Sequence, residues 1–311
     1  MSYPQVVKFS ISEQKPDTRI TLFQFKELHV HSSILKLYSA YFRRFMDSPD
    51  KVPAPSGAKW KYDWIGEAEE DGSWFVVAKT GRESKEQQQD VDLNTLSIEA
   101  FENIIMSMYQ NPYEIKSTAH LQDITTLADF YCCLPVVSNS LYSAFYRSPN
   151  FLANIKKDRE ILLELSYKLR HRELFNDCLI LISGHWHPDK LGFETKITDP
   201  KLANLAENMY NRMGTMMAHT QQKTLKPISI IGGTQNGVKY AALVSGGSLP
   251  KYHRFLQSCQ PYLKEPISDI LKNKLKLDPS AVAGEGEYSH NFLCIEVNDS
   301  DIPWDITQTD W

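Results

Sequence analysis

The sequence predicts an α+β fold, because an alternating apolar pattern near residue 30 gives way within a few residues to a helical one. Leu28 and Val30 alternate with two histidines, which is the period of a strand with one buried face. His31 and the two serines after it can start a helix, and apolar residues then recur at spacings of three and four: Ile34, Leu35, Tyr38, Phe42 and Phe45. We expect a strand that leads directly into a helical hairpin, with these five side chains on its inner face.

A second β element is predicted between residues 59 and 78. Trp60, Tyr62 and Trp64 alternate with charged residues, and the apolar run 74–78 follows a turn-forming Asp71-Gly72 pair. We expect a β-hairpin that packs on its own domain, although the aromatic alternation also suits a partner-binding surface. Three prolines in 47–57 predict an exposed loop, and the polar segment 81–90 predicts a flexible connector, so residues 47–90 form an insertion.

Helical patterns dominate the rest of the chain. Ser97 is expected to cap a helix that ends at Asn111-Pro112, a second helix covers 121–131, and Pro135 opens a third. Beyond residue 145, three more apolar faces follow at helical spacing: Ile161, Leu162, Leu165 and Leu169, with Asp158 as cap; Leu174, Phe175, Cys178, Leu179, Ile182 and Trp186; and Leu202, Leu205, Ala206, Met209 and Met213, which start at Asp199-Pro200.

The pattern is weaker from Gly214 onward. Residues 225–231 are predicted to form a strand, 232–237 a turn, and 249–263 and 266–277 helices. We therefore expect three parts: a domain at 1–147 with the insertion, a helical extension at 148–213, and a C-terminal region of uncertain fold at 214–311. No repeat pattern of the kelch or ankyrin kind is present.

Composition and charge favour some classes of function over others. A chain of 311 residues with 42% hydrophobic residues and a net charge of −4 gives no electrostatic reason to expect binding to nucleic acid or to anionic membranes. The N-terminus lacks a signal-peptide pattern, and no apolar run reaches the roughly 18 residues of a membrane span. We expect a cytoplasmic or nuclear protein whose five cysteines are reduced.

Several residues could carry chemistry, but each has a simpler interpretation. His31 could act as an acid or base, His185 and His187 with Cys178 could hold a metal, and the glycine-rich loop at 232–237 could cradle a phosphate. The loop lacks a Gly-Lys-Ser/Thr ending, and residues two apart on a helix face different sides. Cys132 and Cys133 could form a redox switch, and the methionines near residue 213 a peptide groove, but both suit apolar packing better. We expect no enzyme, no cofactor and no metal site.

One set of residues points to a known family. The spacing of His31, Leu35, Ser39 and Phe42, preceded by Asp17, resembles the N-terminal signature of the BTB/POZ domain. The segment 127–135, which contains Asp129 and Tyr131, resembles a later Leu-Ala-Asp-x-Tyr region of the same family, and Tyr109 stands where the family often has a tyrosine. The resemblance covers about the first half of the chain. The acidic, aromatic C-terminus at 292–311 is similar to that of the long BTB proteins common in filamentous fungi.

The resemblance implies a small mixed sheet flanked by helical hairpins, and a protein that binds other proteins. It implies self-association, or recruitment of a partner such as the cullin scaffold of a ubiquitin ligase, for which this chain would be a substrate adaptor. Cullin-binding members usually carry a hydrophobic-x-Glu motif in the loop after the second helix, and here Ile65-Gly-Glu67 is only a distant candidate. The alternatives are a homo-oligomerising scaffold or transcription-associated regulator, or a ligand-binding or enzymatic region between 214 and 311.

Overall fold

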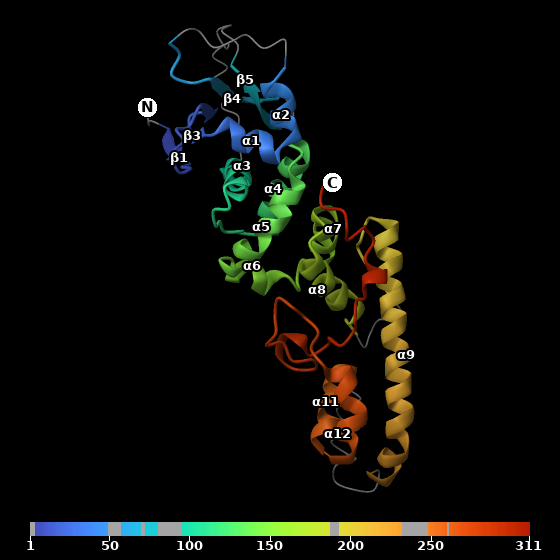
Figure 1. Cartoon of the computed structure of the whole chain (residues 1–311). Helices are drawn as coiled ribbons and strands as arrows, with labels where there is room; N and C mark the ends of the chain where they lie inside the picture. Colours follow the sequence, from blue (N-terminus) through green and yellow to red (C-terminus); the bar gives the residue numbers. More distant parts are fainter. Residues whose placement is uncertain are drawn as a thin grey trace. The chain divides into compact units, whose positions relative to one another are not determined.

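The computed structural model describes residues 4–48, 57–69, 72–79, 95–186, 193–231, 248–259 and 261–311. The chain divides into two compact units, Met1–Ser148 with Trp311, and Pro149–Asp310. The first unit combines a sheet with helices, and the second is mainly helical (Figure 1). The predicted α+β class is therefore confirmed.

The sheet of the first unit has five strands in the order β1-β3-β2-β4-β5. They are β1 (Gln5–Lys8), β2 (Thr18–Leu22), β3 (Lys26–Val30), β4 (Tyr62–Ala68) and β5 (Trp74–Ala78). β2 and β3 pair antiparallel, as do β4 and β5, whereas β1 pairs with β3 and β4 with β2 in parallel. The predicted hairpin thus exists as β4 and β5, and its pairing with β2 makes it part of the main sheet.

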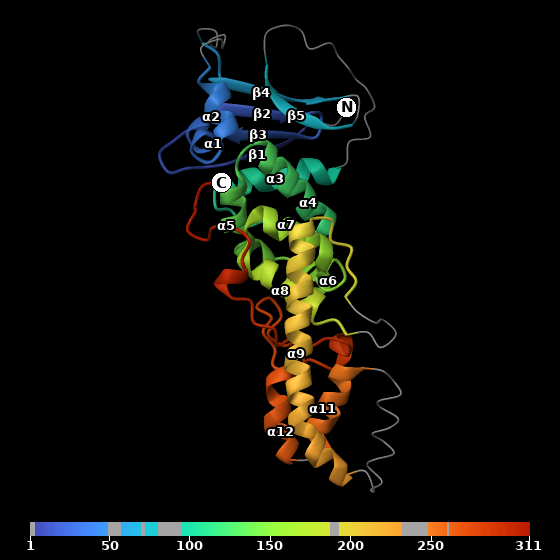
Figure 2. The same cartoon turned by 90° about the vertical axis from the view of Figure 1, so that its right-hand side faces the viewer.

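Five helices complete this unit, and Figure 2 shows α3, α4 and α5 on one side of the sheet. They are α1 (Ser32–Tyr38), α2 (Ala40–Met46), α3 (Thr95–Met108), α4 (Thr118–Phe130) and α5 (Leu134–Tyr146). As predicted, α3 ends just before Asn111 and Pro135 lies in the first turn of α5. The core between sheet and helices is apolar and fully buried, with side chains that include Ile20, Leu28, Leu35, Phe42, Phe101, Ile124 and Tyr131.

The predicted inner face of the α1–α2 hairpin is only partly correct. Leu35 and Phe42 are fully buried, but Phe45 is 48% exposed and Tyr38 is half-buried. The reason is Ser39, whose extended backbone (φ −129°, ψ 118°) separates α1 from α2. Helical spacing does not continue through such a break, so Met46 takes the inner position expected for Phe45.

The predicted cap of α3 is also wrong. The helix already includes Thr95, so Ser97 lies inside its first turn. The Ser97 hydroxyl instead accepts a hydrogen bond of 2.8 Å from the Trp74 indole nitrogen on β5.

The second unit contains six described helices and three short 3₁₀ turns. The helices are α6 (Pro149–Asn154), α7 (Arg159–Leu169), α8 (Arg172–Ser183), α9 (Pro200–Ile231), α11 (Leu249–Cys259) and α12 (Pro261–Ser268). The 3₁₀ turns cover Asp269–Leu271, Gly286–Tyr288 and Asp299–Asp301. Helix α9 is 32 residues long and lies beside α8 and α12 (Figures 1 and 2).

Several predictions for this unit are corrected. Residues 225–231 are the last turns of α9 and not a strand, and α9 runs without interruption through Gly214. Ile161 is 50% exposed, and Leu163 is buried in its place. The segment 272–277 is not helical, because the chain leaves α12 through a single 3₁₀ turn. The predicted turn at 232–237 lies outside the described residues.

The C-terminal segment packs closely against α8. The Phe292 N–H donates to the Gly184 carbonyl, and the Trp186 N–H donates to the His290 carbonyl, both at 2.8 Å. A Cβ on Gly184 would stand 1.9 Å from the Phe292 carbonyl oxygen, so only glycine fits there. The buried residues 292–295 therefore complete the core of this unit.

None of the helices in the described part of the chain combines the length and the apolar character that crossing a membrane requires.

Candidate functional site

Most of the seven residues that carry the family resemblance, which we call the signature residues, form two clusters in the first unit. In the first cluster, the Asp17 carboxylate accepts hydrogen bonds from the Ser32 N–H (2.7 Å) and hydroxyl (2.6 Å) at the start of α1. Burial alone would raise the pKa of Asp17, but these bonds outweigh burial, and the pKa is lowered. Asp17 therefore fixes the junction of β3 and α1.

His31 belongs to the same cluster. The Tyr109 hydroxyl accepts from the His31 N–H at 2.7 Å and lies 2.8 Å from Nδ1, while Nε2 lies 3.3 Å from the Gln14 carbonyl. Burial raises the pKa of Tyr109 to about 12. Both ring nitrogens of His31 thus have partners inside the fold, and the residue is 3% exposed, which fits a structural role better than the acid–base alternative.

The second cluster joins Ser39, Phe42 and Tyr131. The Ser39 hydroxyl donates to the Tyr131 carbonyl at 2.6 Å and accepts from the Phe42 N–H at 3.1 Å. The rings of Phe42 and Tyr131 are stacked, with centroids 5.6 Å apart and an interplanar angle of 2°. The Tyr131 hydroxyl accepts from the Val76 N–H at 3.0 Å, so this cluster connects α2 and α4 with β5.

The structure brings six of the seven signature residues into these clusters or the adjoining core. Leu35 is fully buried in α1. Asp129 differs, because it is exposed near the end of α4, where its carbonyl accepts from the Cys132 N–H. Cys132 has a φ of 51° and directs the chain from α4 into α5.

Four aromatic side chains form a partly exposed surface above the second cluster, which we call the aromatic face: Tyr41, Phe45, Phe75 and Phe130. The ring centroid of Tyr41 lies 4.6 Å from that of Phe45 and 5.5 Å from that of Phe130. The ring centroids of Phe130 and Phe75 are 6.1 Å apart. Phe45 and Phe130 are 48% and 49% exposed, so each has a large apolar area that a binding partner could cover. Such a connected exposed group is typical of a protein interaction site.

The frame beneath the aromatic face is fixed. The Tyr41 hydroxyl donates to the Val76 carbonyl at 3.1 Å, and burial raises the pKa of this tyrosine. Tyr41 also contacts Tyr131 edge to face at 5.1 Å. The Arg43 guanidinium donates to the carbonyls of Lys36 and Leu37 at the end of α1, which holds α2 against α1.

The aromatic face is not among the sites predicted from the sequence. Helical spacing predicts Phe45 as a core residue, and the segment around Phe130 contributes only to the family resemblance. The four-residue spacing of Tyr41 and Phe45 indicates that the two side chains share one face of a helix. Their exposure depends on the break at Ser39 and on the end of α4, which the spacing does not reveal.

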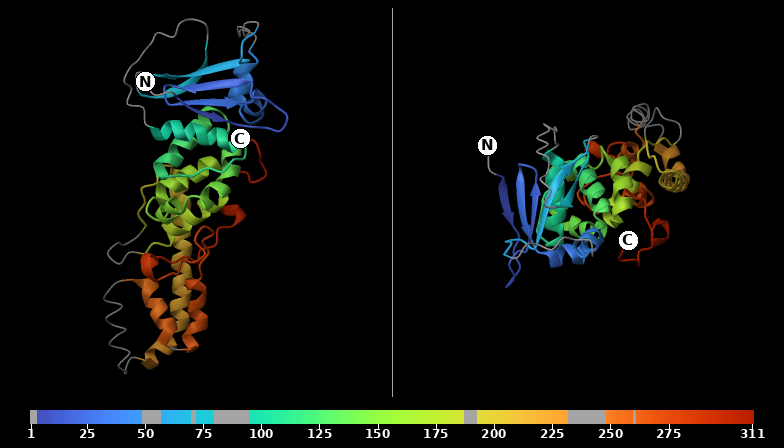
Figure 3. Two further views of the ribbon diagram at one scale, coloured as in Figure 1. Left: turned by 90° about the vertical axis from the view of Figure 1, so that its left-hand side faces the viewer. Right: turned by 90° about the horizontal axis from the view of Figure 1, so that it is seen from above.

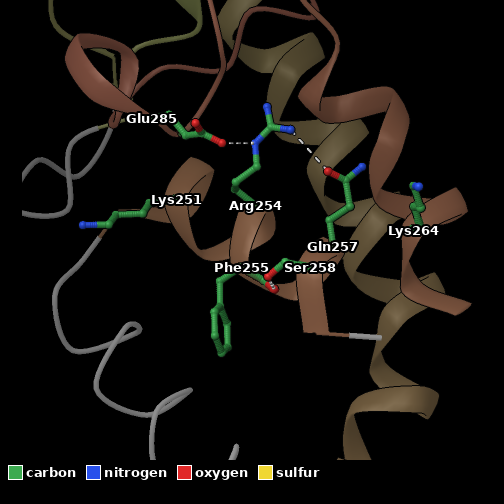
Figure 4. A pocket seen from close by; sticks show the side chains of 8 residues that line it. Lys251, Arg254, Phe255, Gln257, Ser258, Lys264 and Glu285 are labelled. Atoms are coloured by element: carbon green, nitrogen blue, oxygen red, sulfur yellow. Dashed lines mark hydrogen bonds and ion pairs between the residues drawn. The ribbon is translucent and has the colours of Figure 1, made fainter. Parts of the chain in front are cut away.

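A second candidate is a cavity of about 790 Å³ in the second unit, between α11 and α12 and the loop at Gly284. Figure 4 shows that its cationic side chains do not converge, because Lys251 and Lys264 extend toward opposite ends. Arg254 is held by the Ala283 carbonyl (2.9 and 3.1 Å), Gln257 and Glu285. Arg254 therefore anchors the 283–285 loop on α11.

The remaining chemical candidates are not assembled into sites. Cys133 and Cys178 are buried, and burial raises the pKa of each thiol. Met209, Met213 and Met217 are buried core residues of α9. Within the described residues no group of three histidine, cysteine or carboxylate side chains could hold a metal ion. His187 and the loop 232–237 lie outside those residues.

Comparison with protein-family models, curated proteins and solved structures gives no match to this chain.

Proposed function

We propose that this chain is a non-enzymatic protein-interaction protein whose first unit is a BTB/POZ-type domain that recruits a protein partner through the aromatic face. One observation carries the proposal: the residues that carry the resemblance support the residues of the aromatic face. Ser39, Phe42 and Tyr131, which carry the resemblance, are the buried frame on which Tyr41, Phe45 and Phe130 are held.

The chemistry of the aromatic face supports binding to another protein. Aromatic side chains held in place by a rigid frame contribute strongly to interfaces, because little side-chain entropy is lost when they are buried. The hydroxyl of Tyr41 and the stacking of Tyr131 provide such a frame. Arg44 directly precedes Phe45 on the same helix and is exposed, which favours a partner with an acidic side chain beside an apolar centre.

The resemblance implies a cullin scaffold as the partner. One feature departs from that pattern, since Ile65 and Glu67 lie within strand β4 and not in a loop. Both residues pair with β5, and Ile65 also pairs with β2. They therefore do not form the loop motif of cullin-binding members, and we propose that a cullin would bind through the aromatic face.

Light scattering after size-exclusion chromatography tests the proposal. The purified chain is analysed alone and mixed with the N-terminal domain of a cullin from the same organism. A joint complex supports the adaptor version of the proposal. A cullin-independent dimer supports the homo-oligomerising scaffold, and a monomer in both runs directs the search to another partner of the aromatic face.

A further inference from the structure

Residues 296–310, which we call the acidic segment, differ in composition from the helices that they contact. The segment contains five side-chain carboxylates and neither lysine nor arginine. Among the described residues, its backbone–backbone hydrogen bonds join only residues three positions apart, as in the turns that begin at Asn298 and Asp305. Figure 3 shows the segment, in red, on the outside of the helices of the second unit. Contacts that involve side chains therefore hold it in place.

Two arginines on different helices pair with the acidic segment. The Arg212 guanidinium of α9 lies 3.0 Å from the Asp301 carboxylate and donates to the Glu296 carbonyl at 3.2 Å. Arg172, the first residue of α8, forms an ion pair with Asp299. The side chains of Arg172 and Arg212 are 41% and 43% exposed. Salt therefore screens both ion pairs, and each contributes little to stability.

Trp304 anchors the acidic segment on two helices. Its ring meets Phe175 of α8 edge to face, with centroids 4.9 Å apart, and its centroid lies 6.1 Å from that of Tyr167 of α7. Ile302 is also buried, whereas residues 305–310 are exposed. An anchored aromatic side chain with charged pairs at its rim is typical of an interface between a protein and a bound peptide.

We propose that the acidic segment is the resident ligand of a peptide-binding surface on α7, α8 and α9, and that an acidic peptide of a partner protein, with a tryptophan as anchor, replaces it. We call this surface the acceptor surface: Tyr167, Arg172, Phe175 and Arg212. Charge complementarity favours this occupant, because departure of the segment leaves both arginines without these acidic partners. The exchange does not require the helices to unfold, because the segment is held by surface side chains. The proposal does not depend on the aromatic face, which belongs to the first unit.

Binding of a labelled synthetic peptide with the sequence of residues 296–310 tests the exchange. Fluorescence anisotropy is measured with the full chain as wild type and as Trp304→Ala, which removes the anchor of the chain's own segment. Trp304→Ala should bind the peptide about tenfold more tightly or better, because its acceptor surface is vacated more easily. Ile306→Ala is the matched control, since Ile306 is 50% exposed, and it should bind like the wild type. A scrambled peptide of the same composition should bind to none of these chains.

A charge exchange tests the acceptor surface even if Trp304→Ala disturbs the fold. Asp299→Arg in the full chain brings two like charges together, so this variant should also bind the unchanged peptide more tightly than the wild type. A chain with Arg172→Asp should instead prefer a peptide that carries Asp299→Arg. Binding to Trp304→Ala and Asp299→Arg that is no tighter than to the wild type would overturn the proposal. So would equal binding of the scrambled peptide.

Discussion

Tyr109 shows how one side chain joins distant segments of the first unit. Its hydroxyl is bound by the N–H and Nδ1 of His31, although the two residues are 78 positions apart. The ring also packs on Phe9, with centroids 4.7 Å apart. This tyrosine thereby connects β1, the β3–α1 junction and the end of α3.

Replacement of Tyr109 by phenylalanine should lower the free energy of unfolding by about 1–3 kcal/mol, because the His31 N–H loses its partner while the ring remains. Urea unfolding of both proteins at neutral pH measures the difference. Tyr146→Phe is the control, since Tyr146 is 91% exposed and its substitution should have no effect. Equal loss in both variants would show that the His31 bond does not stabilise the fold.

Asp177 is a buried carboxylate whose ionisation opposes folding. It is 2% exposed and accepts from the N–H groups of Lys276 (2.8 Å) and Leu277 (2.8 Å). Burial raises the pKa of Asp177 to about 6, although these bonds lower it in part. Because the folded pKa exceeds that of the unfolded chain, about 3.9, the contribution of this group to stability falls as pH rises from 4 to 6.

Asp177→Asn should remove this dependence on pH. Relative to the wild type, the variant should gain about 3 kcal/mol in free energy of unfolding between pH 4 and pH 7, from about two pKa units. The comparison between the two proteins at each pH cancels the opposite effect of His171, whose pKa is lowered by burial to about 4. Urea unfolding at four pH values measures this gain in the free energy of unfolding. Glu207→Gln is the control, because Glu207 is exposed. A constant difference at every pH would contradict this account of Asp177.

At the level of elements, close packing of the backbone limits which substitutions the second unit tolerates. Gly184→Ala should destabilise this unit by about 1–3 kcal/mol or more, because the new Cβ has no space beside the Phe292 carbonyl. Gly214→Ala is the matched control, since nothing lies within 4 Å of its Cβ position in α9, and it should stabilise by up to about 1 kcal/mol. Thermal unfolding of the two variants measures both effects. If they change stability alike, the contact between α8 and the C-terminal segment is not as close as described.

The elements also show what could be predicted from the sequence. The alternation at Leu28 and Val30 and the turn of α5 at Pro135 are set by neighbouring residues, and both were predicted. The break at Ser39 depends on the Tyr131 carbonyl, 92 positions away, so local spacing could not reveal it. The side chains of the aromatic face are brought together by α2, α4 and β5, which explains why the sequence did not indicate it.

At the scale of the whole molecule, the chain is two units with different roles in the proposal. The first unit, Met1–Ser148 with Trp311, contains the signature clusters and the aromatic face. The second unit has its own buried core, which the C-terminal segment completes. Predictions about partner binding at the aromatic face therefore concern the first unit, and the substitutions in Asp177 and Gly184 should leave that binding unchanged.

The central claim is that the aromatic face binds the protein partner, and a calorimetric titration of the chain with the cullin N-terminal domain tests it most directly. We predict that Phe45→Ser weakens binding by about tenfold or more, because an exposed aromatic anchor is lost, and that Tyr146→Ser has no effect. Binding that Phe45→Ser leaves unchanged, or no binding by the wild type, would contradict the claim for this partner.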